Sequence, residues 1–459
     1  MSENKKIKIL TISDHPLSPS GVGIQTRHMI ESLLKTGKYQ FVSLGGAIKH
    51  RDYKPTKVDK WGDDWVVFPV DGYGNQEIVR SILRNDKPDI LWFMTDPRFW
   101  GWMWEIENEI RGLVPMVYYH VWDNYPYPKF NRPFYLSNDV ICTISKVTDD
   151  IVKTVAPEVE SIHVPHSVQT DMFKKYPLQE ITAAKHQSLG VESSKKFVFF
   201  WNNRNARRKQ SGTLIFWFKK FLDKVGHDKA ILIMHTEPND PNGQDLNAII
   251  HDLGITEGQV LISTAKATLL MHTEPKDPNG QDLEAIIHEL ELNEGQVLIS
   301  RDKYDFKEMA MMYNVADCTI NISDAEGFGL STLESLSCET PIVVNMTGGL
   351  QEQVTDGKEW FGIGIEPASK AIIGSQQIPW IREDRLNEDQ FVDALVEIYE
   401  MPKEEREELG RKGRLHILNN YNFENYGKQW DETFSHIYEK YGSWDTRKNY
   451  KSWKMIEIN

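Results

Sequence analysis

A Gly-Phe-Gly loop lies in the segment "SDAEGFGLSTLESLSCETPIVVN", residues 323–345. The pattern predicts a strand that ends at Ser323, then the loop, then a helix over about 331–338. Gly327 and Gly329 let the backbone approach a ligand closely. The free N–H groups at the start of the helix would suit a phosphate. This segment is therefore the first candidate for a binding site.

Two glutamates belong to the same segment. Glu326 precedes the expected helix and Glu334 lies inside it, so they do not share one helical face. They can hold opposite ends of one ligand, each accepting hydrogen bonds from hydroxyl groups such as those of sugars. A strand, a turn and a helix with two solvated glutamates is the alternative that this segment alone leaves open.

A basic cluster stands in the segment "FFWNNRNARRKQ", residues 199–210, directly after another expected strand. It contains Arg204, Arg207, Arg208 and Lys209. Arginine can grip a diphosphate with two hydrogen bonds, and lysine adds a point charge. A basic loop at a helix start is the alternative, but cations are disfavoured there unless an anion intervenes. The cluster therefore favours a diphosphate ligand.

The elements that must position these residues alternate between strands and helices in two series. The first series runs from "IKILTISDH" to "VICTISK", and the second from "KFVFFWN" to "FGIGIEP". Short apolar runs of this kind are typical of buried parallel strands. Two such series predict an α/β protein with two doubly wound domains, and a ligand in such sheets binds beyond the carboxyl ends of the strands. The cleft between the domains is then the natural active site.

Composition limits the function further. The 459 residues carry a net charge of −14, which comes from a balance of +1 over residues 1–196 and −15 over the remainder. Acidic character argues against sequence-blind nucleic-acid binding, and the basic stretch at 49–60 is read as a solvated loop. The sequence contains no apolar run long enough to span a membrane and only three scattered cysteines. The absence of a secretion signal at the start predicts a cytoplasmic protein.

Several motifs together resemble the retaining GT-B glycosyltransferases of family 4. The segment "EGFGLSTLE" resembles the family's E-x7-E signature, and the spacing from Arg204 to Lys209 its R-x4-K. Further similar segments lie along nearly the whole chain: "SPSGVGIQTRHM" (18–29), "VPHSVQTDMF" (164–173), "MMYNVADC" and "TGGLQEQVTDG" (347–357). The sequence departs from the family at Ser331, at Glu339, and at His166 with Ser167, where the family usually has Pro, Gly and Asn-Gly. These departures leave the identity of the donor open.

The resemblance implies a GT-B fold with two Rossmann-like domains that face a cleft. We expect an acceptor-binding domain over 1–168, an interdomain linker over 169–195, a donor-binding domain over 196–420 and a C-terminal helical segment over 421–459 that can cross back to the first domain. The linker region reads as polar and without sustained periodicity.

The resemblance also implies roles for single residues, carried over position by position. Glu326 would face the donor sugar and His120, in "YYHVWD", would lie close to the reacting sugar; both are the catalytic candidates. A lone strand histidine is also compatible with a core residue. The expected donor-binding residues are Arg204 and Lys209 for the diphosphate, Glu334 for the ribose, the backbone of Phe328, Gly329 and Leu330, and Gly21 and Gly23 from the other domain.

The implied activity is transfer of a sugar from a nucleotide diphosphate sugar to a hydroxyl acceptor, with retention of configuration. The resemblance implies a hexosyltransferase without cofactor or metal, since the basic pair takes the metal's place and no Asp-x-Asp stands at a strand end. Its acceptor is a glycan, a lipid-linked molecule or another hydroxyl compound, with peripheral membrane contact left open. The aromatic stretches at 96–104 and 122–135 can form an acceptor platform or pack in the core.

Three rival functions remain. A GT-B epimerase or phosphorylase is disfavoured by the loop at 326–334, and a non-catalytic sugar-nucleotide or glycan-binding protein would keep the fold without turnover. An NAD dehydrogenase needs a third glycine where "SGVGIQT" has Thr26.

A tandem repeat interrupts the second series. Residues 231–263 and 268–300 are identical at 25 of 33 positions, and the duplicated units extend over 231–267 and 268–304. Each copy predicts one β-α-β unit, and two copies are too few for a solenoid. A parallel crossover does not fit into the four residues between the copies, so the second copy must turn back or leave the sheet. We expect a duplication tolerated at the sheet edge, with the first copy better formed because Gly254 can end its helix.

Overall fold

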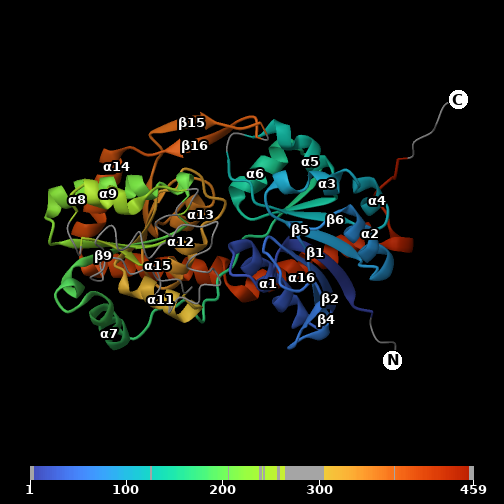
Figure 1. The fold of residues 1–459 in the computed structure, drawn as a ribbon, viewed down its shortest axis with the longest axis horizontal. Coiled ribbons are helices and arrows are strands. Elements are labelled where there is room, and N and C mark those ends of the chain that lie inside the picture. The colour runs from blue at the N-terminus through green and yellow to red at the C-terminus, as the bar shows by residue number, and fades with distance from the viewer. Residues whose placement is uncertain are drawn as a thin grey trace, which may run out of the picture.

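The computed structural model describes residues 5–124, 127–204, 206–236, 240, 243–255, 259–263, 304–376 and 378–453. Its chain forms two α/β domains that lie side by side, the first built on an eight-stranded sheet and the second on a six-stranded sheet (Figure 1). The predicted fold class is confirmed. No helix in the described ranges is long and apolar enough to cross a membrane.

The first sheet has the order β3-β4-β2-β1-β5-β6-β7-β8, and all of its pairs except β3 with β4 are parallel. Strand β5, with the sequence ILWFM, is buried along its whole length because β1 and β6 flank it and helices cover both faces. The bounds of the strands are β1 Ile7–Asp14, β2 Tyr39–Gly46, β3 Thr56–Val58, β4 Gly62–Pro69, β5 Ile90–Met94, β6 Met116–His120, β7 Val140–Thr143 and β8 Glu160–His163.

The helices of the first domain begin with ordinary caps. The Ser20 side chain accepts a hydrogen bond from the N–H of Gly23 and starts α1, and Ser145 caps α6 in the same way. Their bounds are α1 Gly21–Leu34, α2 Gln76–Asn85, α3 Gly101–Trp104, α4 Glu107–Arg111, α5 Arg132–Leu136 and α6 Lys146–Val155, with 3-10 turns η1 Pro97–Phe99 and η2 Lys129–Asn131.

The second sheet is wholly parallel, in the order β11-β10-β9-β12-β13-β14. The chain starts at β9, moves outward to β11, and then returns to β12 on the other side of β9. The point between β9 and β12 is therefore the topological switch, where ligands of doubly wound sheets bind. The strands are β9 Phe197–Asn202, β10 Ala230–His235, β11 Val260–Ser263, β12 Cys318–Asn321, β13 Ile342–Asn345 and β14 Gly362–Ile365.

Helices cover both faces of the second sheet. They are α8 Ser211–Val225, α9 Leu246–Asp252, α11 Phe306–Val315, α12 Leu330–Ser337, α13 Leu350–Val354, α14 Glu388–Glu400 and α15 Lys403–Asn420, with 3-10 turns η3 Ser193–Lys195 and η4 Arg207–Lys209. Glu339, directly after α12, has a φ of +62°, the left-handed region that favours glycine. The departure from the family's usual Gly at this position is therefore accommodated at some cost in backbone strain.

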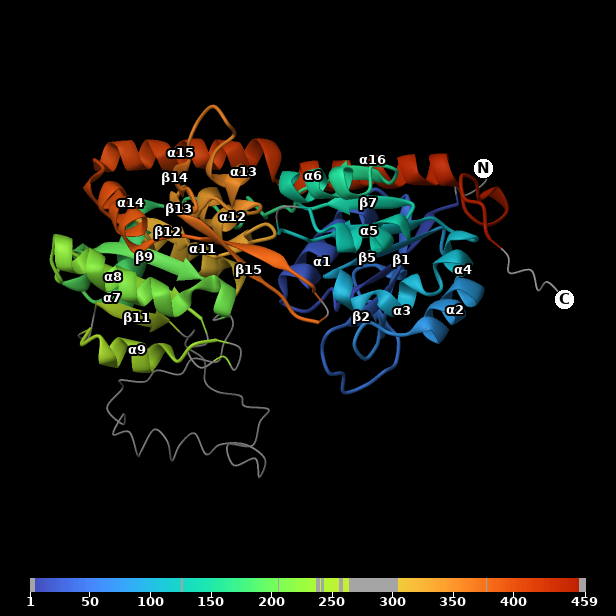
Figure 2. The same ribbon diagram turned by 90° about the horizontal axis from the view of Figure 1, so that it is seen from above.

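The C-terminal helix α16, Phe423–Tyr441, leaves the second domain and packs on the first. In Figure 2, α15 and α16 run one after the other along the same side of the molecule and span both domains. Trp430 of α16 is fully buried against Trp92 and Tyr119, and the hydroxyl of Tyr39 donates to Asp431 at 2.6 Å. A short turn, η5 Trp444–Thr446, follows. The helix thus fastens the end of the chain to the first domain, as the predicted fold class allowed.

Two elements differ from the sequence-based expectations. The polar region expected as a linker contains helix α7, Leu178–Leu189, which packs against α11 of the second domain. The sequence of α7 shows little hydrophobic periodicity because Ile181 is the only buried residue of this helix. A two-stranded antiparallel hairpin of β15, Ser369–Ile373, and β16, Ile381–Arg385, was not predicted. It extends from the second domain toward the first (Figure 1).

The first copy of the repeat forms β10, α9 and β11, and among the described residues β11 is the outermost strand of the second sheet. The left-handed Gly254, with a φ of +59°, follows α9 at its C-terminal end. A β-α-β unit at the edge is therefore observed for the first copy. The second copy, apart from Tyr304, lies outside the described residues.

Deleting residues 264–300 should leave a folded protein that still binds nucleoside diphosphates. The deletion keeps β10, α9 and β11 and joins Ser263 to the segment that leads into α11. Circular dichroism, thermal unfolding and calorimetric titration with nucleoside diphosphates would check this expectation. A folded deletion variant without nucleotide affinity would show that the duplication is a working part.

Candidate active site

Two buried residues of opposite charge meet at the switch point of the second sheet. Strands β9 and β12 are direct neighbours, so the loops after both strands leave the sheet at the same edge. Lys209 comes from the first loop and Glu326 from the second, and the two side chains form an ion pair. Only 8% of the Lys209 side chain and 12% of the Glu326 side chain are exposed. The structure thus brings together two residues predicted from the sequence.

The Lys209–Glu326 pair has little contact with water, and this burial affects the pKa values of both side chains. Burial lowers the pKa of Lys209 to about 8, although the neighbouring Glu326 opposes this shift. Burial would raise the pKa of Glu326, but the charges of Lys209 and Arg208 keep it below its ordinary value. The carboxylate is therefore ionised at neutral pH, and Lys209 supplies a cation with few competing waters.

The arginines of the same loop also contact acceptors within the protein. Arg204 Nε lies 2.5 Å from Asp240 Oδ2, and Arg207 pairs with Glu383 of β16 at 2.6 Å. Their side chains are 64% and 58% exposed and accessible to a ligand, whereas Asp240 and Glu383 are only 7% and 2% exposed, so a ligand anion must compete with buried carboxylates for both cations. Arg208 donates to the carbonyl of Ala325. The loop therefore carries a concentrated positive charge that protein carboxylates balance in this structure.

The Gly-Phe-Gly loop is packed closely against the loop that precedes α13. Gly329 has a φ of +92°, and a Cβ there would lie 2.6 Å from Leu350. A Cβ at Gly349 would lie 2.6 Å from the Cα of Phe328, and the N–H of Gly349 donates to the carbonyl of Glu326 at 3.0 Å. Glycine is required at these positions because two backbones approach each other. Phe328 itself is buried, so it can offer only its backbone to a ligand.

Glu334 lies inside α12, behind the loop. Its carboxylate accepts a hydrogen bond of 2.8 Å from the hydroxyl of Tyr313, which in turn accepts one of 2.8 Å from Asn202 at the end of β9. Burial raises the pKa of Glu334 to about 7, and the Tyr313 hydrogen bond only partly offsets this. Glu334 is therefore a buried acceptor held in place by two neighbouring elements.

Helix α1 of the first domain begins opposite the start of α12. A Cβ at Gly21 would lie 3.3 Å from the Leu330 side chain, so these two predicted residues face each other across the domains. Gly23 instead packs closely against a loop of the first domain, because a Cβ there would lie 2.6 Å from Ser18 Oγ and 2.7 Å from the carbonyl of His15. Gly21 thus lies at the domain junction, while the close packing of Gly23 is local.

Asp123 was not singled out from the sequence. It follows β6 of the first domain, and its Oδ2 would lie 4.0 Å from a Cβ at Gly327. Burial raises the pKa of Asp123 to about 6, Arg208 and Lys209 oppose this shift, and Glu326 adds to it. The first domain therefore contributes a carboxyl group to the cluster of Arg208, Lys209 and Glu326.

His120 is fully buried at the end of β6. Its Nε2 lies 2.7 Å from the hydroxyl of Tyr135, and burial lowers its pKa to about 3. The imidazole is therefore neutral, and its polar contact is with Tyr135 of the first domain. Its proximity to a reacting sugar stays a prediction.

The residues that sequence reasoning missed all lie where separate segments meet. The carboxyl-end rule for parallel strands could have indicated Asp123, which comes three residues after β6 ends. No local signal connects Asp240, which belongs to the first copy of the repeat, with Arg204, or Glu383 with Arg207. Over the described parts of the chain, no group of three or more His, Cys, Asp or Glu side chains could hold a metal ion.

Residues 199–416 match the model of the family described as glycosyl transferases group 1. Among curated proteins, the chain is 29% identical over 134 residues to D-inositol 3-phosphate glycosyltransferase of Paenarthrobacter aurescens, which is 29% of this chain and 26% of that protein. It is 36% identical over 104 residues to the protein of the same name from Thermomonospora curvata, 20% of this chain and 24% of that one. The chain thus matches only about a quarter of the length of these curated relatives.

Solved structures share the fold over almost the whole chain. Sucrose-phosphate synthase of Thermosynechococcus elongatus matches with a TM-score of 0.68 at 13% identity, covering 95% of this chain and 100% of that one. Anabaena HepE in complex with UDP-glucose matches with a TM-score of 0.62 at 15% identity, covering 93% and 99%. At these identities the likeness shows the fold.

Replacing Lys209 by methionine should lower the free energy of unfolding by about 3–5 kcal/mol, because Glu326 would stay buried without its cation. The double variant Lys209→Met/Glu326→Gln removes the orphaned charge and should recover most of the loss. Lys224→Met, at the exposed ion pair with Asp393, serves as control and should cost less than about 1 kcal/mol. Urea unfolding would measure all three, and a double variant no more stable than Lys209→Met would contradict the account of the pair.

Proposed function

We propose that this chain, whose residues 199–416 match the model of the glycosyl transferases group 1 family, transfers a sugar from a nucleotide diphosphate sugar to a hydroxyl acceptor. The observation that carries the proposal is the convergence of the basic loop with Glu326 and Glu334 at the switch point of the family-matched domain. Such a site offers cations for a diphosphate and carboxylates for sugar hydroxyls in one place.

The donor would lie across the carboxyl edge of the second sheet. Lys209 and Arg204 would hold the diphosphate, with the backbone of Phe328, Gly329 and Leu330 completing its contacts. HepE, which shares the fold, is described in complex with UDP-glucose, which supports a nucleotide diphosphate sugar as donor here. Glu334 would accept hydrogen bonds from the ribose hydroxyls, and it accepts most strongly when it is ionised.

The main chemical task is stabilisation of the departing diphosphate. Charge that develops on the leaving oxygen would meet the buried cation of Lys209, whose interaction with an anion is strengthened by the low local exposure to water. Arg204 would exchange Asp240 for a phosphate oxygen. In this scheme no metal ion is needed, since the two basic side chains neutralise the leaving group.

Glu326 would orient the donor sugar once Lys209 turns toward the diphosphate. The acceptor hydroxyl would approach from the face that the diphosphate leaves, so the sugar keeps its anomeric configuration and no covalent protein intermediate is required. Asp123 faces this region from the first domain, close to Gly327, and closure of the domains would exclude the water that competes with the acceptor. The sugar transferred would be a hexose.

The assignment predicts different losses for the charged residues. Arg204→Ala should weaken nucleoside diphosphate binding by about 1.5–3 kcal/mol, the value of one charge-assisted hydrogen bond, and should leave nucleoside monophosphate binding less affected. Glu334→Ala should weaken nucleotide binding, whereas Glu326→Ala should mainly lower turnover. Calorimetry and release of nucleoside diphosphate from a panel of nucleotide sugars would measure both.

Four outcomes would overturn this assignment. Unchanged nucleoside diphosphate affinity in Arg204→Ala would remove the basic loop from the site. Tight nucleotide binding without sugar transfer to any acceptor or to water would favour a non-catalytic sugar-nucleotide-binding protein. A product that remains a nucleotide sugar, or transfer to inorganic phosphate, would instead indicate an epimerase or a phosphorylase.

A further inference from the structure

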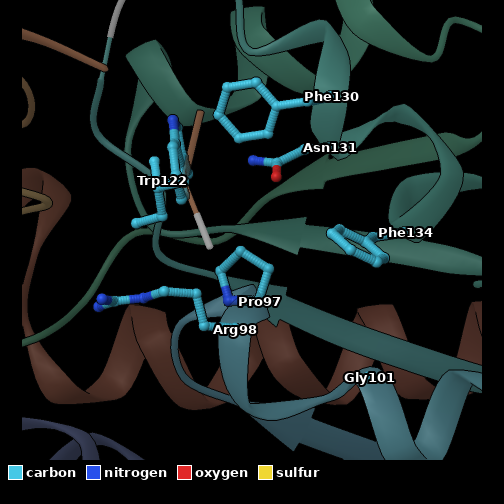
Figure 3. Close-up of a pocket in the computed structure, with 8 residues that line it drawn as sticks. Pro97, Arg98, Gly101, Trp122, Phe130, Asn131 and Phe134 are labelled. Carbon is cyan, nitrogen blue, oxygen red and sulfur yellow. The ribbon is translucent and has the colours of Figure 1, made fainter. Parts of the chain in front are cut away.

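A pocket of about 210 Å³ opens at the carboxyl ends of β5 and β6 in the first domain. Its wall comes from three segments of that domain, at 97–101, Trp122 and 130–134, and from the turn of the β15–β16 hairpin in the second (Figure 3). The lining residues are Pro97, Arg98, Gly101, Trp122, Phe130, Asn131, Phe134 and Ile378.

We propose that this pocket, here called the aromatic pocket, binds one sugar ring of the acceptor; the assignment of that sugar as acceptor rests on the proposed function. Three aromatic rings, those of Trp122, Phe130 and Phe134, contribute to its surface, and aromatic faces suit the C–H face of a pyranose. The volume is below that of ordinary drug-sized sites, so it admits a single ring rather than a long chain.

Buried polar groups distinguish this pocket from an apolar gap. Asn131 lines it with only 2% of its surface exposed, and its Nδ2 lies 3.5 Å from the hydroxyl of Tyr135, at the limit of a hydrogen bond. The Nε1 of Trp122 is buried and has no hydrogen-bond partner within the described part of the chain. A buried donor without a partner is costly, and hydroxyl groups of a sugar could satisfy both side chains.

The position of the pocket connects it with the proposed transfer site. Trp122 is the direct neighbour of Asp123, which faces the loop of Glu326 and Gly327. On the other side, Asn131 lies next to Tyr135, whose hydroxyl contacts His120. A ring in the pocket would therefore lie beside the cluster that Asp123 forms with Arg208, Lys209 and Glu326. His120 would lie behind the wall of the pocket.

The hairpin couples the pocket to the basic loop of the second domain. Near its turn, Trp380 packs edge-on against Phe130 with ring centres 5.6 Å apart, and Asn124 donates to the carbonyl of Arg382 at 3.0 Å. At its base, Glu383 binds Arg207. The second domain thus completes the pocket of the first, so the pocket is fully formed only when the two domains are together.

Gly101 offers a way to fill the pocket without disturbing its wall. A Cβ at this position meets no atom within 4 Å, and its φ is not in the left-handed region. Gly101→Leu should therefore fold normally and occupy the pocket, while Gly101→Ala adds only one carbon and serves as the matched control. Trp380→Ala removes the ring that packs against the lining residue Phe130, and its control is Trp360→Ala, which removes an exposed tryptophan that precedes β14.

Saturation-transfer NMR titrations with methyl glycosides of glucose, galactose, mannose and N-acetylglucosamine would test the proposal. At least one glycoside should bind the wild type, and Gly101→Leu should weaken it by about tenfold or more. Trp380→Ala should weaken it by about threefold to tenfold, because Phe130 loses the ring that packs edge-on against it. Both controls should bind as the wild type does.

Nucleoside diphosphate affinity, measured on the same proteins, separates this proposal from the function on which it rests. Glycoside binding that depends on Gly101, without nucleotide affinity in any protein, would overturn the proposed function and leave the sugar pocket standing. Nucleotide binding with no glycoside bound would overturn the proposal that the pocket binds a sugar. Glycosides bound equally well by the wild type and by Gly101→Leu would overturn it too. Gly101-sensitive binding of decanoate in place of every glycoside would overturn it as well, in favour of an acyl chain.

Discussion

The arrangement of the site depends on one interaction, the buried ion pair between Lys209 and Glu326. Removing two charges from water costs more than their attraction alone commonly returns, so such a pair is weak evidence for stability. The position of the ion pair explains its presence better than a gain in stability does. Each partner comes from a loop at the switch point, and each is balanced by the other until a ligand with its own charges arrives. A diphosphate next to hydroxyl groups is a ligand that could engage both.

The two domains are held together around this pair by contacts of different kinds. Glu352 of α13 accepts a hydrogen bond of 2.8 Å from the N–H of Lys146, the first residue of α6, so a carboxyl group of one domain meets a helix start of the other. The N–H of Val168 donates to the carbonyl of Tyr421 at 2.9 Å, where the chain crosses between domains. Helix α16 then packs along the first domain. The arrangement of the two domains therefore rests on polar contacts at the cleft and on apolar burial far from it.

Much of the fold could be predicted from local patterns. Runs such as ILWFM and IVVN indicate buried parallel strands when helices alternate with them. Glycines before an expected helix indicate that the backbone approaches a ligand or another backbone closely. The placement of Lys209 and Glu326 in loops after strands of the second domain was predicted, whereas their ion pair appears only in the structure. These predictions succeeded because each depends on a short stretch and on a general rule of parallel sheets.

The remaining features depend on contacts between distant segments. Helix α7 buries only Ile181, so its sequence carries almost no periodic signal. Asp240 became relevant only when the first copy of the repeat brought it to Arg204, and Glu383 only through the unpredicted hairpin. Glu339 shows that a family position usually held by glycine can keep its left-handed backbone with another residue. Single-sequence reasoning finds such partners only after the strand order is known.

The most direct test of the central claim is a crystal structure of the protein with the nucleoside diphosphate that it binds best. The account predicts that Lys209 leaves Glu326 for a phosphate oxygen, that Arg204 leaves Asp240 for the same group, and that Glu334 lies within hydrogen-bond distance of the ribose. A diphosphate bound elsewhere, with the Lys209–Glu326 pair still closed, would contradict it.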